Sequence, residues 1–404
     1  MRFVKTLVVL GWLHLAVGCS AAVEVGLDNV GSYRHLFEGK RVGIIANHTA
    51  RTGEGRFVVD VFSEMKLGTV TALFSPEHGF RGDERAGAEI DSSVDPVTGL
   101  AIYSLYGKTR KPTDEMLRNV DVLVFDIQDV GARFYTYIYT MSLAMEAATE
   151  YGKRFVVLDR PNPINGVTIE GKVLEPEFAS FIGKYPLPVR FGMTMGELAK
   201  MFNEQGWLAG GVRAELAVVP LSGWRRGMWY DQTALKFIKP SPNIPDVATA
   251  TVYPGLCLLE GTNVSEGRGT DMPFKTFGAP WIDARSLTSR LRQLRVAGVR
   301  FEQVEFTPTA SKHEGQRCHG CRIIVTDRSS FEPFRAGVLI VNEIHKMYPE
   351  SFGWRASHFD RLCGTSKIRE AIAAGRSLEQ LRDDWREELD AFKRIRAKYL
   401  LYPE

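Results

Sequence analysis

The stretch Val120-Asp-Val-Leu-Val-Phe125, followed at once by Asp126-Ile-Gln-Asp129, joins a short apolar run to an acidic end. Three similar apolar runs occur in the same half of the chain, at residues 41–46, 69–74 and 154–158. Helical patterns lie between such runs, most clearly at 55–65 and 135–151. Continuous apolar strands that alternate with helices are typical of a parallel sheet covered on both faces. We therefore predict an α/β fold whose first half is a Rossmann-like parallel sheet domain.

Polar side chains follow each of these four strands, at the edge where the carboxyl ends of parallel strands meet. Ligands of open α/β sheets bind outside that edge. Asp and Asn are also common in turns, so one such residue would indicate little. Because all four strands end in this way, we predict a site there. The residues are Asn47, His48, Glu77, His78, Asp126, Asp159, Arg160 and, slightly further on, Asn162.

The length of 404 residues is too great for one ordinary hydrophobic core, so two domains are expected. A proline-rich bridge at 239–245 marks the predicted boundary. We predict a Rossmann-like domain at 23–245, which carries the site, and a smaller C-terminal α/β domain at 250–404. The net charge of +3 gives no reason to expect a nucleic acid as partner, and no protein partner is predicted.

The first 22 residues are predicted to be an export signal. Basic residues precede a short apolar stretch, Leu7–Val17, which is followed by small residues. This stretch is too short to span a bilayer as a permanent helix. Leu15-Ala-Val-Gly-Cys19 resembles a bacterial lipobox, so a soluble product and a lipoprotein both stay open. We predict an exported, periplasmic protein that contacts the membrane only if a lipid is attached to Cys19.

Neither a cofactor nor a metal is predicted. The loop after the first strand lacks the G-x-G-x-x-G pattern of dinucleotide sites, and no phosphate-binding G-x-x-x-x-G-K-[ST] motif or G-x-S-x-G elbow occurs. Cys318-His-Gly-Cys321 lacks the second cysteine pair that a zinc site needs. Packed thiols or a local disulfide explain this pair more simply.

Glu77 is the first candidate for acid–base chemistry. It lies in Ser75-Pro-Glu-His-Gly79, where proline and glycine fix the loop. A carboxyl that is partly desolvated beside Phe74 has a raised pKa, which suits a general acid. A helix cap, or an ion pair with Arg81 or Arg85, is the structural alternative.

The neighbouring motifs have the composition of a sugar site. Asp126 and Asp129 are followed by Arg133 and by aromatic residues that begin with Phe134 and Tyr135. Carboxylates and arginine can bind sugar hydroxyls, and rings can stack on the apolar face of a sugar. Glycoside hydrolysis usually pairs a general acid with a second carboxylate. We predict Asp126 or Glu170, which follows the fourth rim loop, for that second role.

The second half opens with a polar, glycine-rich loop at 260–271 that contains Glu260, Glu266, Arg268 and Asp271. A plain linker rarely carries so many charged residues among glycines. We therefore predict that this loop reaches over the rim of the first domain and that Glu266 and Arg268 contribute to substrate binding.

Several motifs together resemble those of the exo-β-N-acetylmuramidases of peptidoglycan recycling, a family first catalogued as a domain of unknown function. The matching stretches are Gly43–His48, Phe74–Gly82, Phe125–Tyr137, Leu158–Pro163 and Glu260–Thr270. The resemblance extends from about Val25 to the C-terminus. It implies a Rossmann-like catalytic domain, a smaller second domain, and a cleft between them. It also implies release of N-acetylmuramic acid from the non-reducing end of peptidoglycan fragments, with the key carboxylate at Glu77.

Other interpretations remain open at this point. A non-catalytic periplasmic protein that binds peptidoglycan would use the same rim residues, and an ester or amide hydrolase could use Glu77 and His78. The lactyl carboxylate of N-acetylmuramic acid could be bound by Arg133 or by Arg268, because a guanidinium donates two parallel hydrogen bonds. The reaction could use a direct pair, Glu77 with Glu170, or the acetamido group of the substrate, held by Asp126 or Asp129.

Overall fold

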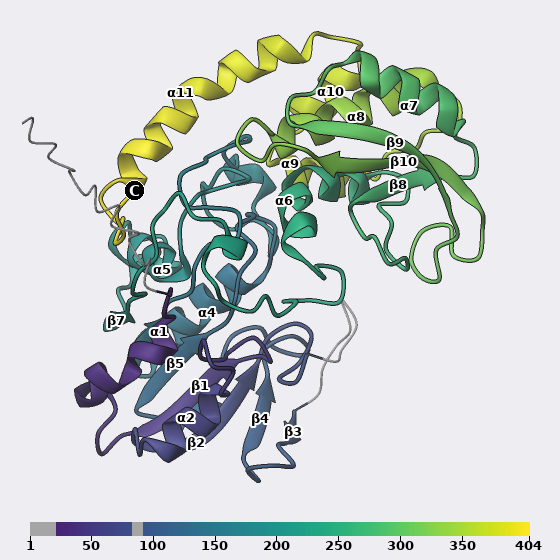
Figure 1. Ribbon diagram of the computed structural model, residues 1–404. Coiled ribbons are helices and arrows are strands. Elements are labelled where there is room, and N and C mark those ends of the chain that lie inside the picture. Colours follow the sequence, from purple (N-terminus) through teal and green to yellow (C-terminus); the bar gives the residue numbers. More distant parts are fainter. Residues whose placement is uncertain (1–21, 83–91) are drawn as a thin grey trace, which may run out of the picture.

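The computed structural model describes residues 22–82 and 92–404 (Figure 1). The predicted export signal up to residue 21, with Cys19, lies outside the described residues. Within the described ranges, no helix is both long enough and apolar enough to cross a membrane.

The first unit is built on a seven-stranded sheet with the strand order β3-β4-β2-β1-β5-β6-β7. The strands are β1 (Arg41–Ala46), β2 (Thr69–Ser75), β3 (Ser93–Val94), β4 (Ala101–Ser104), β5 (Val122–Asp126), β6 (Arg154–Leu158) and β7 (Leu216–Val219). All neighbouring pairs are parallel except β3 with β4. The predicted α/β class and the parallel sheet are confirmed. The order reverses between β1 and β5, which is where ligands bind in sheets of this kind.

Both faces of this sheet are buried, which explains why its strands are continuously apolar. In β5, Leu123 and Phe125 face one core, whereas Val122 and Val124 face the other. The helices of this unit are α1 (Gly26–Asn29), η1 (Val30–Leu36), α2 (Val58–Glu64), α3 (Asp114–Leu117), α4 (Tyr137–Glu150), η2 (Pro176–Phe178), α5 (Met195–Glu204), η3 (Ala209–Gly211) and η4 (Tyr230–Gln232). The helices α4 and α5 pack against one face, while α1 and α2 pack against the other.

The second, smaller unit contains an antiparallel sheet with the order β8-β10-β9. Its elements are α6 (Val247–Leu256), η5 (Cys257–Gly261), β8 (Thr276–Ala279), α7 (Ala284–Gln293), β9 (Val299–Phe306), β10 (Cys318–Val325), α8 (Pro333–Met347), α9 (Ala356–Cys363) and α10 (Lys367–Ala373). The helices α6 and α8 cross closely: a Cβ on Gly255 would lie 1.8 Å from the carbonyl oxygen of Pro333. Because η5 follows α6 directly, this contact between α6 and α8 also fixes the position of η5.

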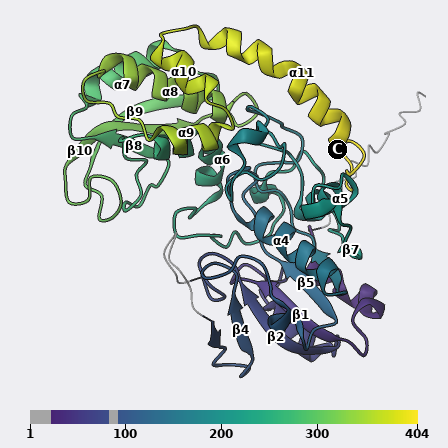
Figure 2. The same cartoon turned by 180° about the vertical axis from the view of Figure 1, so that it is seen from behind.

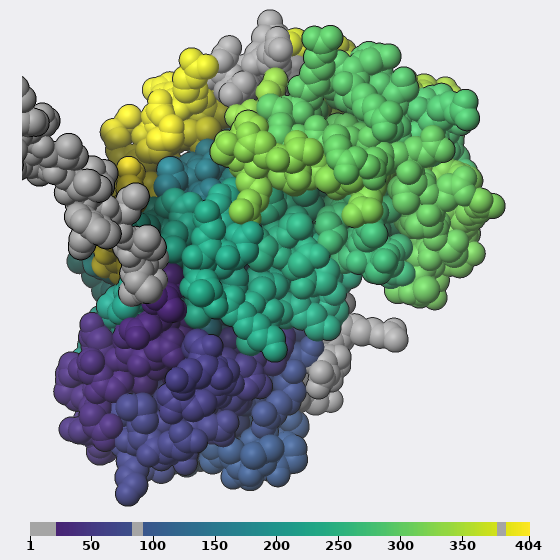
Figure 3. Space-filling model, in the orientation of Figure 1, coloured from purple at the N-terminus to yellow at the C-terminus, as the bar shows by residue number. Residues whose placement is uncertain are grey.

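The chain then returns to the first unit. Helix α11 (Leu378–Arg396) reaches from the second unit towards α5 in both views (Figures 1 and 2). The Tyr402 hydroxyl donates to Asp159 Oδ2 at 2.5 Å, and the Leu401 amide donates to Glu197 Oε1 at 2.8 Å. In the space-filling view, the green second unit rests on the teal residues that follow the first sheet (Figure 3). The division into 23–245 and 250–404 stays a prediction.

Candidate active site

A pocket of about 140 Å³ lies where the carboxyl edge of the first sheet meets the second unit. Its walls come from segments far apart in the sequence. They are Glu77, His78, Tyr106, Phe134, Tyr135, Thr136, Ile182, Ser241, Asn243, Ile244, Tyr253, Glu260, Arg268 and Phe274. We call this the Glu77 pocket.

Glu77 reaches the pocket because the loop after β2 turns sharply. His78 and Gly79 both have positive φ values, 72° and 77°, and the Gly79 amide donates to the Pro76 carbonyl at 3.1 Å. A positive φ is uncommon for a residue other than glycine, so the turn at His78 is a specific feature of this loop. It leaves Glu77 half-buried at the end of the strand.

Two hydroxyl groups hold the Glu77 carboxyl. Thr136 Oγ1 donates to Glu77 Oε2 at 2.9 Å. The Tyr106 phenol also binds Glu77, and burial together with the Glu77 charge raises the pKa of Tyr106 to about 12. The alternative ion pair with Arg81 does not form, because Arg81 Nη2 binds Asp95 Oδ1 at 2.6 Å. Arg85 lies outside the described residues.

Aromatic rings form a continuous wall of the pocket. The Tyr253 ring lies edge-on to three others, with centroid distances of 5.2 Å to Phe134, 6.0 Å to Tyr135 and 4.8 Å to Phe274. The first two precede α4 in the first unit, whereas Tyr253 and Phe274 belong to the second unit. The ring wall therefore spans both units and offers an apolar surface beside the Glu77 carboxyl.

The adjoining part of the pocket is charged: the Arg268 guanidinium lies 5.1 Å from the centroid of the Phe274 ring. Glu260 Oε1 accepts hydrogen bonds from Arg268 Nη2 at 2.6 Å and from Arg268 Nε at 3.1 Å. Glu266 Oε1 lies 3.2 Å from Arg268 Nε, and Glu266 Oε2 lies 2.8 Å from Lys312 Nζ. The predicted loop over the rim thus exists, and Arg268 lines the pocket. Glu266 is buried behind Arg268 and does not line it.

Asn47 and His48 shape the pocket from behind. His48 Nε2 lies 2.8 Å from the Lys239 carbonyl oxygen. Asn47 Nδ2 donates to the Tyr137 hydroxyl at 3.0 Å, and that hydroxyl donates to the Pro240 carbonyl at 2.8 Å. These bonds hold the proline-rich bridge, and Ser241, Asn243 and Ile244 of that bridge line the pocket.

Four of the other predicted rim residues lie outside the Glu77 pocket. Asp126 and Arg160 form a buried ion pair beside a separate cavity of about 510 Å³. Asp159 Oδ1 and Oδ2 accept from the Gly196 amide and from the hydroxyl groups of Thr194 and Tyr402. Asn162 Nδ2 donates to the Met193 carbonyl. None of these four side chains lines the Glu77 pocket.

Asp129 is buried, and its Oδ2 accepts from the Gly131 amide at 2.7 Å. Its Oδ1 has no hydrogen-bond partner within the described part of the chain. Burial raises the pKa of Asp129 to about 7. Because Asp129 does not line the pocket either, neither Asp126 nor Asp129 is placed to hold an acetamido group there.

Arg133 is fully buried and joins the two units. Its Nη1 donates to the carbonyl oxygens of Lys172 at 2.7 Å and Leu187 at 2.8 Å, and its Nη2 donates to that of Leu362 at 2.8 Å. A guanidinium bound in this way is not available to a ligand, so the alternative of Arg133 as the lactyl-binding residue is not supported.

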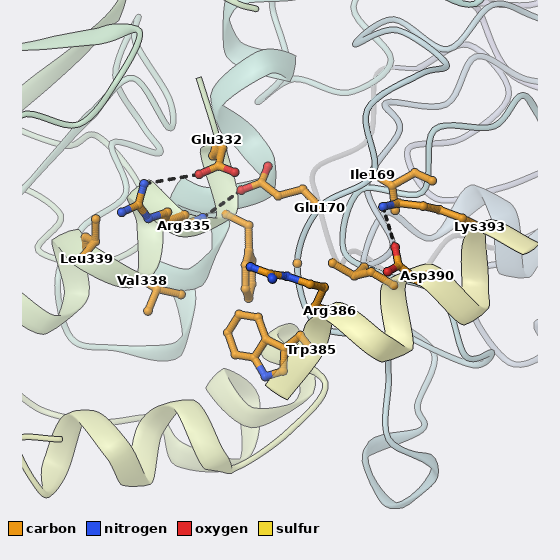
Figure 4. A pocket seen from close by; sticks show the side chains of 13 residues that line it. Ile169, Glu170, Glu332, Arg335, Val338, Leu339, Trp385, Arg386, Asp390 and Lys393 are labelled. Atoms are coloured by element: carbon orange, nitrogen blue, oxygen red, sulfur yellow. Dashed lines mark hydrogen bonds and ion pairs between the residues drawn. The ribbon is translucent and has the colours of Figure 1, made fainter. Parts of the chain in front are cut away.

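Glu170 lies in a different cavity, of about 280 Å³, between α8 and α11 (Figure 4). Its Oε1 accepts from the Arg335 backbone amide, in the first turn of α8, at 3.0 Å. Burial raises the pKa of Glu170 to about 7. This cavity shares no lining residue with the Glu77 pocket, so the direct pair of Glu77 with Glu170 is not formed.

Of the predicted site residues, the structure therefore brings Glu77, His78, Tyr135 and Arg268 into one pocket. Among the described residues, no group of three His, Cys, Asp or Glu side chains could hold a metal ion. The cysteines at 257, 318, 321 and 363 are buried free thiols, so the C-x-x-C pair is a packed pair. Glu260 is a pocket residue that the sequence did not single out, although its place in a charged glycine-rich loop was a signal.

Comparisons with known proteins show one family over almost the whole chain. The model of "Exo-beta-N-acetylmuramidase NamZ, N-terminal" matches residues 42–248, and the corresponding C-terminal model matches residues 251–402. The peptidoglycan beta-N-acetylmuramidase NamZ of Bacillus subtilis (strain 168) is 49% identical over 382 residues, which cover 94% of this chain and 91% of that protein.

Two crystal structures of DUF1343 family proteins from Bacteroides fragilis NCTC 9343 have the same fold. One has a TM-score of 0.87 and 38% identity, and it covers 94% of this chain and 99% of that chain. The other has a TM-score of 0.77 and 32% identity, and it covers 95% of this chain and all of that chain.

Proposed function

The chain belongs to the family of the exo-beta-N-acetylmuramidase NamZ, and from this premise we propose that it releases N-acetylmuramic acid from the non-reducing end of peptidoglycan fragments in the Glu77 pocket. Family membership confirms the predicted enzyme class: the chain is a glycosidase that acts on peptidoglycan. The assignment of the reaction to this pocket rests on one observation. Glu77 lies at the carboxyl edge of the sheet, held by Thr136 and Tyr106, and shares its pocket with Glu260 and Arg268 of the second unit.

Glu77 is the proposed general acid. As the bond between the anomeric carbon and the glycosidic oxygen breaks, the oxygen takes the proton of the Glu77 carboxyl and leaves as a hydroxyl group. The oxygen of a water molecule bonds to the anomeric carbon, and a proton of that water restores Glu77. The hydroxyl groups of Thr136 and Tyr106 fix the direction in which the carboxyl points.

The ring wall and Arg268 account for recognition of the sugar. Tyr253 and its neighbours can stack on the apolar face of the pyranose. Of the five N–H donors of Arg268, those on Nε and Nη2 bind Glu260 and Glu266, whereas Nη1 has no partner among the described residues. We assign Arg268 to the lactyl carboxylate, because a guanidinium is suited to binding carboxylates.

Export is the proposed route by which the enzyme meets its substrate. The sequence of residues 1–22, with its basic start and apolar stretch, supports an exported, periplasmic enzyme. Cell fractionation of the wild-type protein and of Cys19→Ala tests this. Recovery in the periplasm supports export, and a shift from the membrane to the soluble fraction in the variant identifies a lipid at Cys19. Wild-type protein in the cytoplasm contradicts export.

The experiment that tests the function uses two oligosaccharides that differ at the non-reducing end. Purified protein is incubated with the disaccharide of N-acetylmuramic acid β-linked to N-acetylglucosamine, and with a trisaccharide that has one further N-acetylglucosamine in front. The expected result is release of N-acetylmuramic acid from the disaccharide only. Cleavage of both substrates at equal rates contradicts the exo mode, and tight binding without release contradicts catalysis. Glu77→Gln serves as the matched control.

A further inference from the structure

Glu260 is the second carboxylate that faces the Glu77 pocket. The pocket has only two carboxyl side chains in its walls within the described residues, Glu77 from the first unit and Glu260 from the second. Of the carboxylates that the sequence favoured as partners, Asp126 is fully buried against Arg160, and Glu170 lies at another cavity. A glycosidase site usually contains two carboxyl groups with different roles, which makes Glu260 the residue to consider.

The backbone around Glu260 is rigidly placed. Glu260 lies in η5, next to Gly261, and a Cβ on Gly261 would lie 2.5 Å from Phe359 Cα of helix α9. The Gly261 carbonyl accepts from the Arg355 amide at 2.8 Å, and the Thr262 amide donates to Leu259 at 3.0 Å. A side chain on such a fixed turn keeps its position without help from a ligand, as a catalytic group requires.

The surroundings of Glu260 keep its carboxyl ionised. Burial alone would raise its pKa, but the Arg268 guanidinium and the His358 imidazole, whose Nε2 lies 3.4 Å from Glu260 Oε2, together hold that pKa below its usual range. Arg268 occupies Oε1 with two N–H groups, while Oε2 has only the long contact with His358. One oxygen atom of an ionised carboxylate is therefore left to act on a ligand.

Hydrolysis of a glycoside develops positive charge at the anomeric carbon in the transition state. An oriented negative charge at that position stabilises the transition state more than the ground state. We propose that Glu260 faces the anomeric carbon of the bound sugar and stabilises this positive charge, while Glu77 protonates the leaving oxygen. This inference rests on the proposed function and adds the second catalytic residue of the same site.

Glu266 offers a matched control for this role. Both Glu260 and Glu266 bind Arg268, so both contribute to the position of the guanidinium. Only Glu260 lines the pocket, whereas Glu266 is 2% exposed and faces Lys312. If Glu260 served only to hold Arg268, then loss of either carboxylate would have a similar effect on the reaction.

The test compares Glu260→Gln, Glu266→Gln and Glu77→Gln on two substrates: the disaccharide, and an aryl glycoside of N-acetylmuramic acid whose leaving group needs little protonation. Removal of one electrostatic stabiliser costs about 10²–10³-fold in kcat. We expect Glu260→Gln to lose that much on both substrates with KM nearly unchanged. Glu77→Gln should lose far more on the disaccharide than on the aryl glycoside, and Glu266→Gln should stay within about tenfold of the wild type.

Three results would overturn the inference: Glu260→Gln within threefold of the wild type on the aryl glycoside, a loss confined to KM, or equal losses in Glu260→Gln and Glu266→Gln. If the wild-type protein releases no sugar from either substrate, the proposed function itself fails, which is a different outcome. Thermal unfolding shows whether each variant is folded. Where a Gln variant is not folded, the Asp variant replaces it, because Asp keeps the charge and withdraws it by one methylene. Glu260→Asp is then expected to lose at least tenfold in kcat, and an unchanged kcat overturns the inference.

Discussion

Two cavities of this protein contain a buried or half-buried glutamate, and the hydrogen-bond partners of that glutamate differ between them. The cavity of Glu170, at about 280 Å³, is twice as large as the Glu77 pocket, at about 140 Å³. Yet Glu170 uses one oxygen to bind the Arg335 amide at the start of α8, so it ties the two units together. In the Glu77 pocket, two carboxyl groups from different units face the same space. The walls of both cavities come from separate segments of both units and contain further carboxylates, so neither size nor convergence distinguishes them. The difference lies in the partners of the two glutamates: two hydroxyl groups hold Glu77, whereas Glu170 binds a backbone amide.

The largest expected effect is on kcat, and it should differ sharply between substitutions at Glu77 and at Glu170. Glu77→Gln removes the proton source, so kcat on the disaccharide should fall by about 10²–10⁴-fold. Glu170→Gln keeps the shape of a side chain outside the Glu77 pocket, and kcat should stay within threefold of the wild type. Steady-state release of N-acetylmuramic acid measures both. If Glu170→Gln fell as far as Glu77→Gln while remaining folded, the two cavities could not have the separate roles assigned to them.

A second comparison concerns two arginines that the sequence could not tell apart. Arg133 donates to two backbone carbonyl groups of the first unit and to one of the second unit, whereas Arg268 lines the pocket. Arg133→Gln leaves buried carbonyl oxygens without donors, each at a cost of about 1–3 kcal/mol. We expect a loss of several kcal/mol in the free energy of unfolding, measured by denaturant titration. Equal stability of Arg133→Gln and wild type would contradict the structural role.

Arg268→Gln should act on substrate preference instead. A hydrogen bond to a charged group contributes about 1.5–3 kcal/mol, so kcat/KM on the aryl glycoside of N-acetylmuramic acid should fall roughly 10–100-fold more than on that of N-acetylglucosamine. Arg268 also holds Glu260, and disturbance of Glu260 would affect both sugars equally. The ratio between the two sugars therefore isolates recognition of the lactyl carboxylate. An unchanged ratio would remove Arg268 from that role.

The sequence predicted the features that depend on neighbouring residues. Continuous apolar runs located β1, β2, β5 and β6, and the Pro- and Gly-fixed loop located Glu77. The strands β4 and β7, with 4 residues each, are too short to stand out, and they were not predicted. A polar residue after a strand indicates only that the residue lies at the rim. Whether it turns towards a pocket, as Glu77 does, or forms a buried ion pair, as Asp126 does, depends on its partners.

The contacts of Arg133, Glu170 and Glu260 are made with residues further along the chain. This explains why the sequence did not predict the roles that the structure indicates for these three residues. Arg133 binds a carbonyl 229 residues away, and Glu170 binds an amide 165 residues away. Glu260 owes its charge to Arg268, eight residues on, and to His358, 98 residues on. A single sequence contains no signal for such contacts. The glycine-rich loop revealed that charged residues gather near the rim, but not which of them faces the substrate.

The smallest expected effect tests the structural assignment of Glu170 through its response to pH. Burial raises the pKa of the folded-state carboxyl to about 7, from a usual value of 4.5. Between these two values the unfolded chain has released the proton, whereas the folded protein retains it. Stability from this group is therefore fully present below pH 4.5 and is lost as the pH rises through 7. The amide introduced by Glu170→Gln cannot titrate, so this variant removes the dependence.

One pKa unit corresponds to about 1.36 kcal/mol. From pH 5.5 to pH 7, the wild type should therefore lose about 1–2 kcal/mol of unfolding free energy relative to Glu170→Gln. Denaturant titrations at the two pH values measure the difference, and Glu38→Gln, at an exposed surface position, controls for the loss of one charge. Burial also raises the pKa values of Asp129 and Asp159. Both groups are present in the wild type and in Glu170→Gln, so their contributions cancel when the unfolding free energy of one is subtracted from that of the other. Parallel curves for wild type and Glu170→Gln would show that Glu170 is ionised in the folded protein. In that case its carboxylate would be available as a charged group, and the contrast between the two cavities would rest on their geometry alone.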